Sequence, residues 1–178
     1  TPLGAPAAWP QPLRTLVGVT LGSSQPVAWG PQRTLLYNDA YAAILGAKHP
    51  EALGRPFLDV WHEICADLLP VVEQAYAGRP VHRDNIALVM HRNGYPEETY
   101  FAFSYTPVRG VGGHVDGLFC VCTETTAAVQ AEHRAAIERE RLQLLLRQTP
   151  GFAALLMENF PEYSTALISD ILVSSSKD

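Results

Sequence analysis

Apolar residues near the start of the chain first recur with the period of a helix and then form short runs. Between residues 13 and 21 they are spaced three and four apart, which predicts a short amphipathic helix ended by the Gly-Ser-Ser that follows. Residues 25–29 and 33–37 are two β-prone runs separated by Gly-Pro-Gln, which predicts a hairpin. Residues 1–12 are rich in Pro and Ala, so we expect a poorly ordered arm there.

The next stretch carries helical signals that are interrupted by Pro and Gly. Asn38 or Asp39 is suited to cap a helix over residues 40–45, and short helical pieces follow it. Residues 63–77 then keep one apolar face, which predicts a longer helix. Pro70 lies inside this helix, so we expect a kink there or a break between two helices.

Three β-rich runs follow, at residues 81–91, 99–108 and 114–125. The links between them are short and rich in Gly, Asn and Pro, which predicts turns and an antiparallel meander. The middle run alternates aromatic residues with Ala and Ser. We therefore expect a sheet with one bulky, packed face and one face of small residues.

Residues 127–147 contain neither Gly nor Pro and are dominated by Ala, Glu, Arg, Gln and Leu, which predicts a long helix. A heptad frame fits this helix, with an Ala-rich seam for a weak homodimer in which Glu138 sets the register. The frame is too short to establish a coiled coil, and a solvated helix that packs on its own domain is the alternative. The predicted dimer seam consists of Ala128, Ala131, Ala135, Glu138, Leu142 and Leu145.

Five strands on one antiparallel sheet with helices on one face give an α+β fold. We divide the chain into an arm with its amphipathic helix at 1–24, a core at 25–126, a connecting helix at 127–149 and a last segment at 150–178. Thr1 stands where an initiating Met is usual, which suggests a piece of a larger protein. The last segment is either the start of a further domain or a non-native tail.

Composition narrows the class of protein. The 178 residues are 47% hydrophobic and 17% charged, which is typical of a globular domain. A net charge of −5 disfavours binding to nucleic acid or to an anionic membrane. We see no signal peptide and no apolar run of the roughly 20 residues that span a bilayer. Three cysteines are too few for a disulfide framework, so we expect a cytoplasmic protein.

Four stretches of sequence, in this order, resemble a known family. They are WPQPLRTLVGVTL at 9–21, AWGPQRTLLYNDAYAAILGAKHPEALGRPFLDVW at 28–61, HRNGYPEETYFAFSYTPVR at 91–109 and GLFCVCTETT at 117–126. This set is similar to the N-terminal PAS domains of bacterial hybrid sensor histidine kinases. The resemblance implies a PAS fold and a sensory module of a two-component system. Such a module forms a homodimer and signals through its C-terminal helix to a downstream kinase.

The resemblance also implies roles for particular residues. Asn38 matches the Asn that fixes the corner between the second strand and the next helix. Glu124, Thr125 and Thr126 stand where PAS domains carry an Asp-x-Thr motif that joins the last strand to the signalling helix. Glu replaces Asp here, so we expect a looser tie or a different partner. Residues 148–152 resemble the opening of a second PAS domain, which the rest of the last segment does not continue.

Signatures of catalysis, metals and chromophores are missing from the sequence. It contains no Gly-rich nucleotide loop, and His133 lacks the context of a phospho-accepting histidine. The six histidines show no paired metal-ligand spacing, and we expect neither a metal nor haem. Cys65 lies outside the motif that a flavin photosensor needs. We therefore expect no enzyme activity and no cofactor, and only an unidentified small-molecule ligand remains open.

In a PAS fold, a cavity between the sheet and the short helices is suited to such a ligand. The alternative is that its aromatic residues simply fill the core, in a ligand-free module for dimerisation or protein interaction. The residues expected to line the cavity are Trp29, Tyr37, Tyr41, Trp61, Phe101, Phe103, Tyr105 and Phe119.

Overall fold

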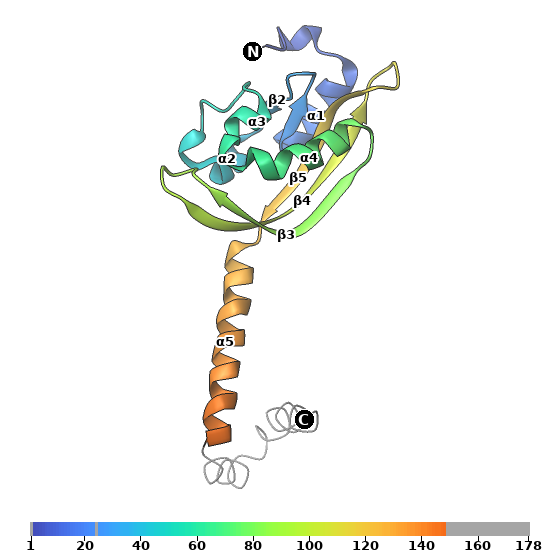
Figure 1. The fold of residues 1–178 in the computed structure, drawn as a ribbon. Helices are drawn as coiled ribbons and strands as arrows, with labels where there is room; N and C mark the ends of the chain where they lie inside the picture. The colour runs from blue at the N-terminus through green and yellow to red at the C-terminus, as the bar shows by residue number, and fades with distance from the viewer. Residues whose placement is uncertain (1, 24, 149–178) are drawn as a thin grey trace. The chain divides into compact units, whose positions relative to one another are not determined.

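The computed structural model describes residues 2–23 and 25–148, and the last segment of the chain, 150–178, lies outside this range (Figure 1). Residues Thr1–Val129 form one compact unit, and the rest of the final helix belongs to a second unit.

A five-stranded antiparallel sheet organises the first unit. Its order is β2-β1-β5-β4-β3, so the N-terminal hairpin pairs with the last strand of the meander. This confirms the predicted α+β PAS fold. The strands are β1 (Val27–Trp29), β2 (Thr34–Leu36), β3 (Val81–Met90), β4 (Glu97–Arg109) and β5 (Val115–Glu124).

Five α-helices accompany the sheet in the described part of the chain, with three short 3-10 turns. The helix that contains Pro70 continues through it, from Cys65 to Tyr76. The predicted helix is instead interrupted near its start, where a 3-10 turn ends at Ile64. The helices are α1 (Gln11–Leu21), α2 (Asp39–Leu45), α3 (Phe57–Val60), α4 (Cys65–Tyr76) and α5 (Thr126–Gln148). The 3-10 turns are η1 (Pro6–Ala8), η2 (Gly46–Lys48) and η3 (His62–Ile64).

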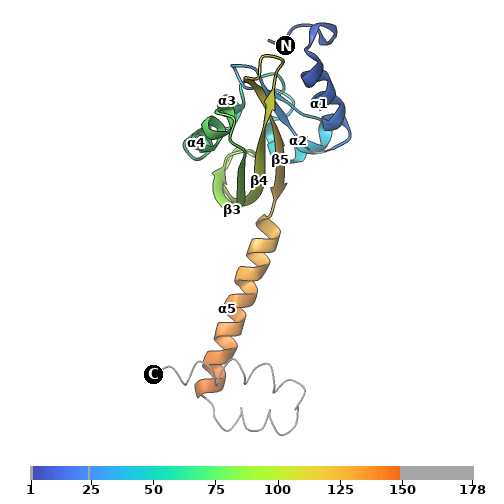
Figure 2. The same ribbon diagram turned by 90° about the vertical axis from the view of Figure 1, so that its right-hand side faces the viewer.

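The sheet carries a hydrophobic cluster on each face. The larger cluster fills the space between the inner face and the helices α2, α3 and α4. The smaller one lies beneath α1, where Leu13 packs with Val27, Trp29 and Leu36 of the outer face. Figure 2 shows α1 on the opposite side of the sheet from α3 and α4.

The N-terminal arm is more ordered than its composition predicts. It contains η1, and the indole N–H of Trp9 donates a hydrogen bond of 3.1 Å to the carbonyl oxygen of Leu3. Both side chains pack against the cluster beneath α1. The apolar residues among the prolines therefore tie the arm to the sheet.

Asn38 joins three segments at the corner after β2. Its side-chain oxygen accepts a hydrogen bond from the backbone N–H of Tyr41 and so caps α2, as predicted. Its side-chain nitrogen donates to the carbonyl oxygens of Thr20 at 2.9 Å and Ser23 at 2.6 Å. The end of α1 and the start of α2 are thus held by one side chain.

Candidate functional site

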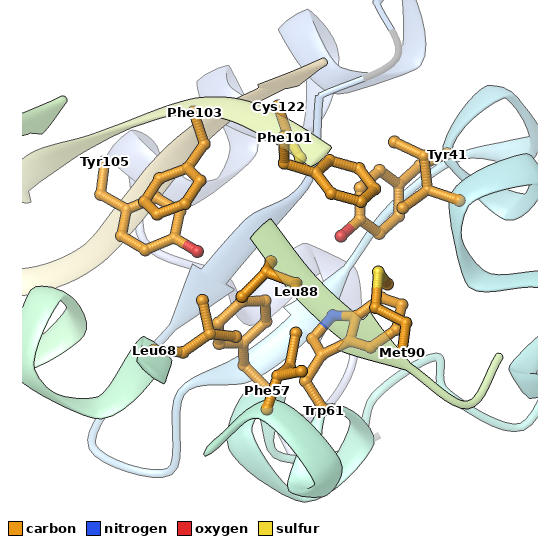
Figure 3. A pocket seen from close by; sticks show the side chains of 12 residues that line it. Tyr41, Phe57, Trp61, Leu68, Leu88, Met90, Phe101, Phe103, Tyr105 and Cys122 are labelled. Carbon is orange, nitrogen blue, oxygen red and sulfur yellow. The ribbon is translucent and has the colours of Figure 1, made fainter. Parts of the chain in front are cut away.

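A cavity of about 30 Å³ lies between the inner face of the sheet and the helices (Figure 3). Twelve side chains line it, and none of them is charged. Tyr41 and Ile44 come from α2, Phe57 from α3 and Leu68 from α4. A space of this size is large enough to hold a water-sized occupant.

The sheet supplies an aromatic wall to this cavity. Residues two apart on a strand face the same side, so β4 directs Phe101, Phe103 and Tyr105 inward. The rings of Phe103 and Tyr105 stack with centroids 4.8 Å apart, and Phe57 meets Tyr105 edge-on at 6.2 Å. Such a wall offers flat apolar surfaces to any occupant.

Polar atoms on the cavity wall are few and neutral. Burial raises the pKa of the Tyr41 and Tyr105 hydroxyls well above the ordinary value, while the Trp61 indole acts on Tyr41 in the opposite direction by hydrogen bonding. Burial, with a smaller effect of the Glu124 charge, raises the pKa of the Cys122 thiol to about 12. Cys122 is therefore a thiol at neutral pH, and not the thiolate that nucleophilic chemistry needs.

Five of the eight aromatic residues predicted to line this cavity do so: Tyr41, Trp61, Phe101, Phe103 and Tyr105. The expectation for Trp29 and Phe119 is wrong, because they face the outer side of the sheet and pack in the cluster beneath α1. Tyr37 lies beside the cavity wall, with its hydroxyl 3.1 Å from Nδ1 of His49.

The prediction also missed part of the wall: it left out Phe57, and it considered no aliphatic or sulfur-containing residue. Leu88 and Met90 lie two apart on β3, and Cys122 follows the buried Cys120 at the same spacing on β5. This period of two is visible in the sequence and identifies the inward-facing positions once the strands are known.

At the end of β5, Glu124 binds a partner that the sequence did not reveal. Two nitrogens of Arg92 donate to its two carboxylate oxygens, Nη1 at 2.7 Å and Nη2 at 3.0 Å. The Arg92 side chain is only 11% exposed, and its Nε lies 3.4 Å from Glu97 at the start of β4. Hydrogen bonding from Arg92 lowers the pKa of the Glu124 carboxyl, which is therefore ionised at neutral pH.

The first turn of α5 is tied to the same carboxylate. The Thr126 hydroxyl donates to Glu124 Oε1 at 2.9 Å and accepts a hydrogen bond of 2.9 Å from the backbone N–H of Tyr100. The backbone N–H of Thr125 donates to the carbonyl oxygen of Tyr100 at 2.7 Å. Sheet and helix are therefore joined through Glu124 and the neighbouring strand β4.

We call the Arg92–Glu124 pair, together with Thr126, the exit of the domain. The exit residues lie close in sequence to residues of the cavity wall. Cys122 precedes Glu124 by two residues on β5, and Met90, the last residue of β3, precedes Arg92 in the following turn by two. The backbone carbonyl of Arg92 accepts a hydrogen bond of 2.8 Å from Ala47, just after α2. The Arg92–Glu124 pair is therefore connected to the end of α2 and lies directly after the cavity residues of β3 and β5.

The predicted dimer seam lies on a polar helix. Its six residues are all exposed, including Leu142 at 44% and Leu145 at 51%. Ile137 and Leu144, which the heptad frame leaves outside the seam, are exposed at 66% and 57%. Val129 is buried and belongs to the first unit. No second chain tests the seam, which stays a prediction.

Residues 29–130 match the family described as PAS fold. The chain belongs to this family. This PAS domain is a sensory domain, and its structure resembles that of an RNA-binding Light-Oxygen-Voltage receptor (TM-score 0.51, 21% identity, 77% of this chain and 41% of that one). A variant of RsLOV gives a TM-score of 0.50 at 17% identity over 92% and 97% of the two chains. The PAS domain of BvgS from Bordetella pertussis gives 0.49 at 18% identity over 71% and 96%.

These identities show the shared fold alone, and no curated protein sequence matches the chain. The PAS domain spans less than half of the RNA-binding receptor. Among residues 2–23 and 25–148, no helix combines the length and hydropathy needed to cross a membrane. Within the same described ranges, no three His, Cys, Asp or Glu side chains gather in a way that suits a metal ion.

Proposed function

We propose that this PAS domain senses a small molecule or a partner for a bacterial two-component protein and relays the change through α5 to a downstream kinase. The observation that carries the proposal is the Arg92–Glu124 pair, which joins elements of the cavity wall to the first turn of α5. The proposal assigns no catalytic reaction to this chain and places it in the cytoplasm.

The size of the cavity supports a relay. A cavity of about 30 Å³ is far smaller than the roughly 150 Å³ that holds a benzene ring in a protein core. An occupant larger than water therefore has to displace side chains of the wall, which include Cys122 on the strand of Glu124 and Met90 just before Arg92. A ligand that binds only the displaced arrangement shifts the balance between the two arrangements.

The proposed downstream partner is inferred from the sequence. The four matching stretches resemble N-terminal PAS domains of hybrid sensor histidine kinases, and this resemblance supports a kinase as the downstream partner. Glu124, Thr125 and Thr126 would then transmit the change, with Arg92 as a fourth member.

The experiment compares two Gln substitutions in the full-length protein by ATP-dependent autophosphorylation. Glu124→Gln breaks the charged exit pair, and Glu132→Gln makes the same chemical change at an exposed position of α5. We expect Glu124→Gln to change the phosphorylation rate severalfold and Glu132→Gln to leave it unchanged. Absence of phosphorylation in the wild-type protein, or equal rates in both variants, refutes the kinase relay.

A second function, a ligand-free dimerisation module, is favoured by the exposed apolar residues of α5. Ile137, Leu142 and Leu145 are large side chains that a paired helix would cover. Native mass spectrometry separates the two functions. A retained small molecule supports sensing, whereas a stable dimer without any bound compound supports the dimerisation module.

A further inference from the structure

The hydroxyl of Tyr105 differs from those of Tyr76 and Tyr100, and also from that of Tyr41 in the same wall, on which the Trp61 indole acts by hydrogen bonding. The Tyr76 hydroxyl donates to the carbonyl oxygens of Ala28 and Gly30, both at 3.2 Å, and the Tyr100 hydroxyl donates to Glu98 at 2.8 Å. Tyr105 as a residue is only 5% exposed, and no hydrogen bond joins its hydroxyl to the described residues. The oxygen is not one of the fully buried, unpartnered atoms of the described chain, so it keeps surface that a bound molecule can reach.

The direction of this hydroxyl is informative. In Figure 3 the Tyr105 side chain extends from β4 with its oxygen toward the space enclosed by Phe57, Leu68 and Leu88. The missing partner is therefore to be sought inside the cavity and not in the protein wall. A molecule larger than water first has to displace side chains of the wall, because the cavity measures only about 30 Å³, and its polar atom can then reach the Tyr105 hydroxyl.

The rest of the wall restricts the charge and shape of that occupant. An ion in the cavity would face no opposite charge, because none of the twelve lining side chains is charged. The stacked rings of Phe103 and Tyr105 and the edge of Phe57 favour a flat ring over a branched or flexible chain.

We infer that the cavity takes a small, neutral, ring-shaped molecule with one hydrogen-bonding atom, which the Tyr105 hydroxyl binds. This inference rests on the proposed sensory function and names the chemical class of its ligand. Tyr105 then acts as a specificity-determining residue: the apolar wall accepts the ring, and the hydroxyl selects rings that carry a polar atom.

Three probes of similar size test the class on the whole 178-residue chain. Phenol carries a neutral hydroxyl, toluene has no polar atom, and benzoate is charged at pH 7. Titrations followed by two-dimensional amide NMR give a dissociation constant for each probe. We expect phenol to bind about fivefold to tenfold more tightly than toluene, the gain typical of one hydrogen bond, and benzoate to bind most weakly.

Tyr105→Phe removes only the hydroxyl, and we expect it to bind phenol and toluene equally. Tyr100→Phe is the matched control, because the Tyr100 hydroxyl bonds to Glu98 and lies outside the cavity wall. It should keep the preference for phenol. If Tyr105→Phe fails to fold, the ranking of the three probes on the wild-type chain still decides the neutral class.

The outcomes distinguish this inference from the sensory function on which it rests. Benzoate binding as tightly as phenol overturns the neutral class but leaves a ligand-binding cavity. An unchanged preference for phenol in Tyr105→Phe overturns the role of Tyr105. Failure of all three probes to shift any cavity resonance, at concentrations up to their solubility, overturns the inference alone. Ligand sensing is then still tested by native mass spectrometry, in which a retained small molecule of another class supports it.

Discussion

Replacement of Arg92 by Gln should destabilise the PAS domain by about 2 kcal/mol. The substitution removes both hydrogen bonds to Glu124 and leaves its carboxylate without the cation. Exposed ion pairs contribute about 0–1 kcal/mol, and breaking a fully buried pair costs about 3–5 kcal/mol. The two side chains here are 11% and 30% exposed, so we expect a value between these classes.

Urea denaturation followed by tryptophan fluorescence measures this cost, because Trp61 is buried at the cavity wall. Arg79→Gln, at an exposed position, removes the same charge and should change the free energy of unfolding by less than about 0.5 kcal/mol. A cycle that combines Arg92→Gln with Glu124→Gln should give a coupling energy of about 1–2 kcal/mol. Additivity within about 0.5 kcal/mol would refute a direct energetic link between the two residues.

The pH dependence gives an independent check on the same pair. Hydrogen bonding from Arg92 lowers the pKa of the Glu124 carboxyl from its ordinary 4.5. The stability from this pair is therefore fully present above pH 4.5 and is lost as the pH falls through the lowered pKa. The difference between wild type and Arg92→Gln should be constant near neutral pH and shrink in acid. A difference that grows in acid contradicts the assignment.

Three further predictions concern other parts of the domain. Asn38→Ala removes the cap of α2 and the two hydrogen bonds to Thr20 and Ser23, so it should lower the free energy of unfolding by about 1–3 kcal/mol in thermal denaturation. An unchanged melting temperature would show that water replaces these bonds. Gly117→Ala places a Cβ 2.5 Å from the Trp29 ring and 2.8 Å from the Ala28 carbonyl oxygen. It should therefore lower the free energy of unfolding, measured with urea, by about 1–3 kcal/mol. A neutral effect would mean that β1 shifts freely. Leu142→Ala should weaken a homodimer seen by analytical ultracentrifugation, and equal sedimentation of variant and wild type argues against the predicted seam.

Periodicity in the sequence predicted the meander β3–β4–β5 because its strands are long enough to show alternation. In β4, three aromatic residues separated by Ala and Ser place the bulky face toward the helices. The strands of the N-terminal hairpin have only three residues each and are buried on both faces. Alternation carries no information there, which is why Trp29 was assigned to the wrong side of the sheet.

Of the Arg92–Glu124 pair, only Glu124 could be identified from the sequence. The resemblance to PAS domains pointed to Glu124 and Thr126, and the Glu in place of Asp predicted a changed contact. Its partner Arg92 lies 32 residues earlier in a turn, and only the pairing of β4 with β5 and of β4 with β3 brings the two together. A contact between side chains so far apart in sequence depends on the register of two strand pairs, which one sequence does not define.

The double role of Asn38 has a consequence for where this domain begins as a folding unit. Residues 29–130 suffice for recognition of the family, but α1 lies before them. Thr20 in its last turn and Ser23 just after it accept the two hydrogen bonds that the Asn38 amide donates. A fragment cut at residue 29 would uncover Trp29 and Leu36, which Leu13 and its neighbours now shield. We expect such a fragment to aggregate or to be digested rapidly by proteases. We therefore expect the folding unit of this domain to include α1 and to be longer than the segment 29–130 that matches the family.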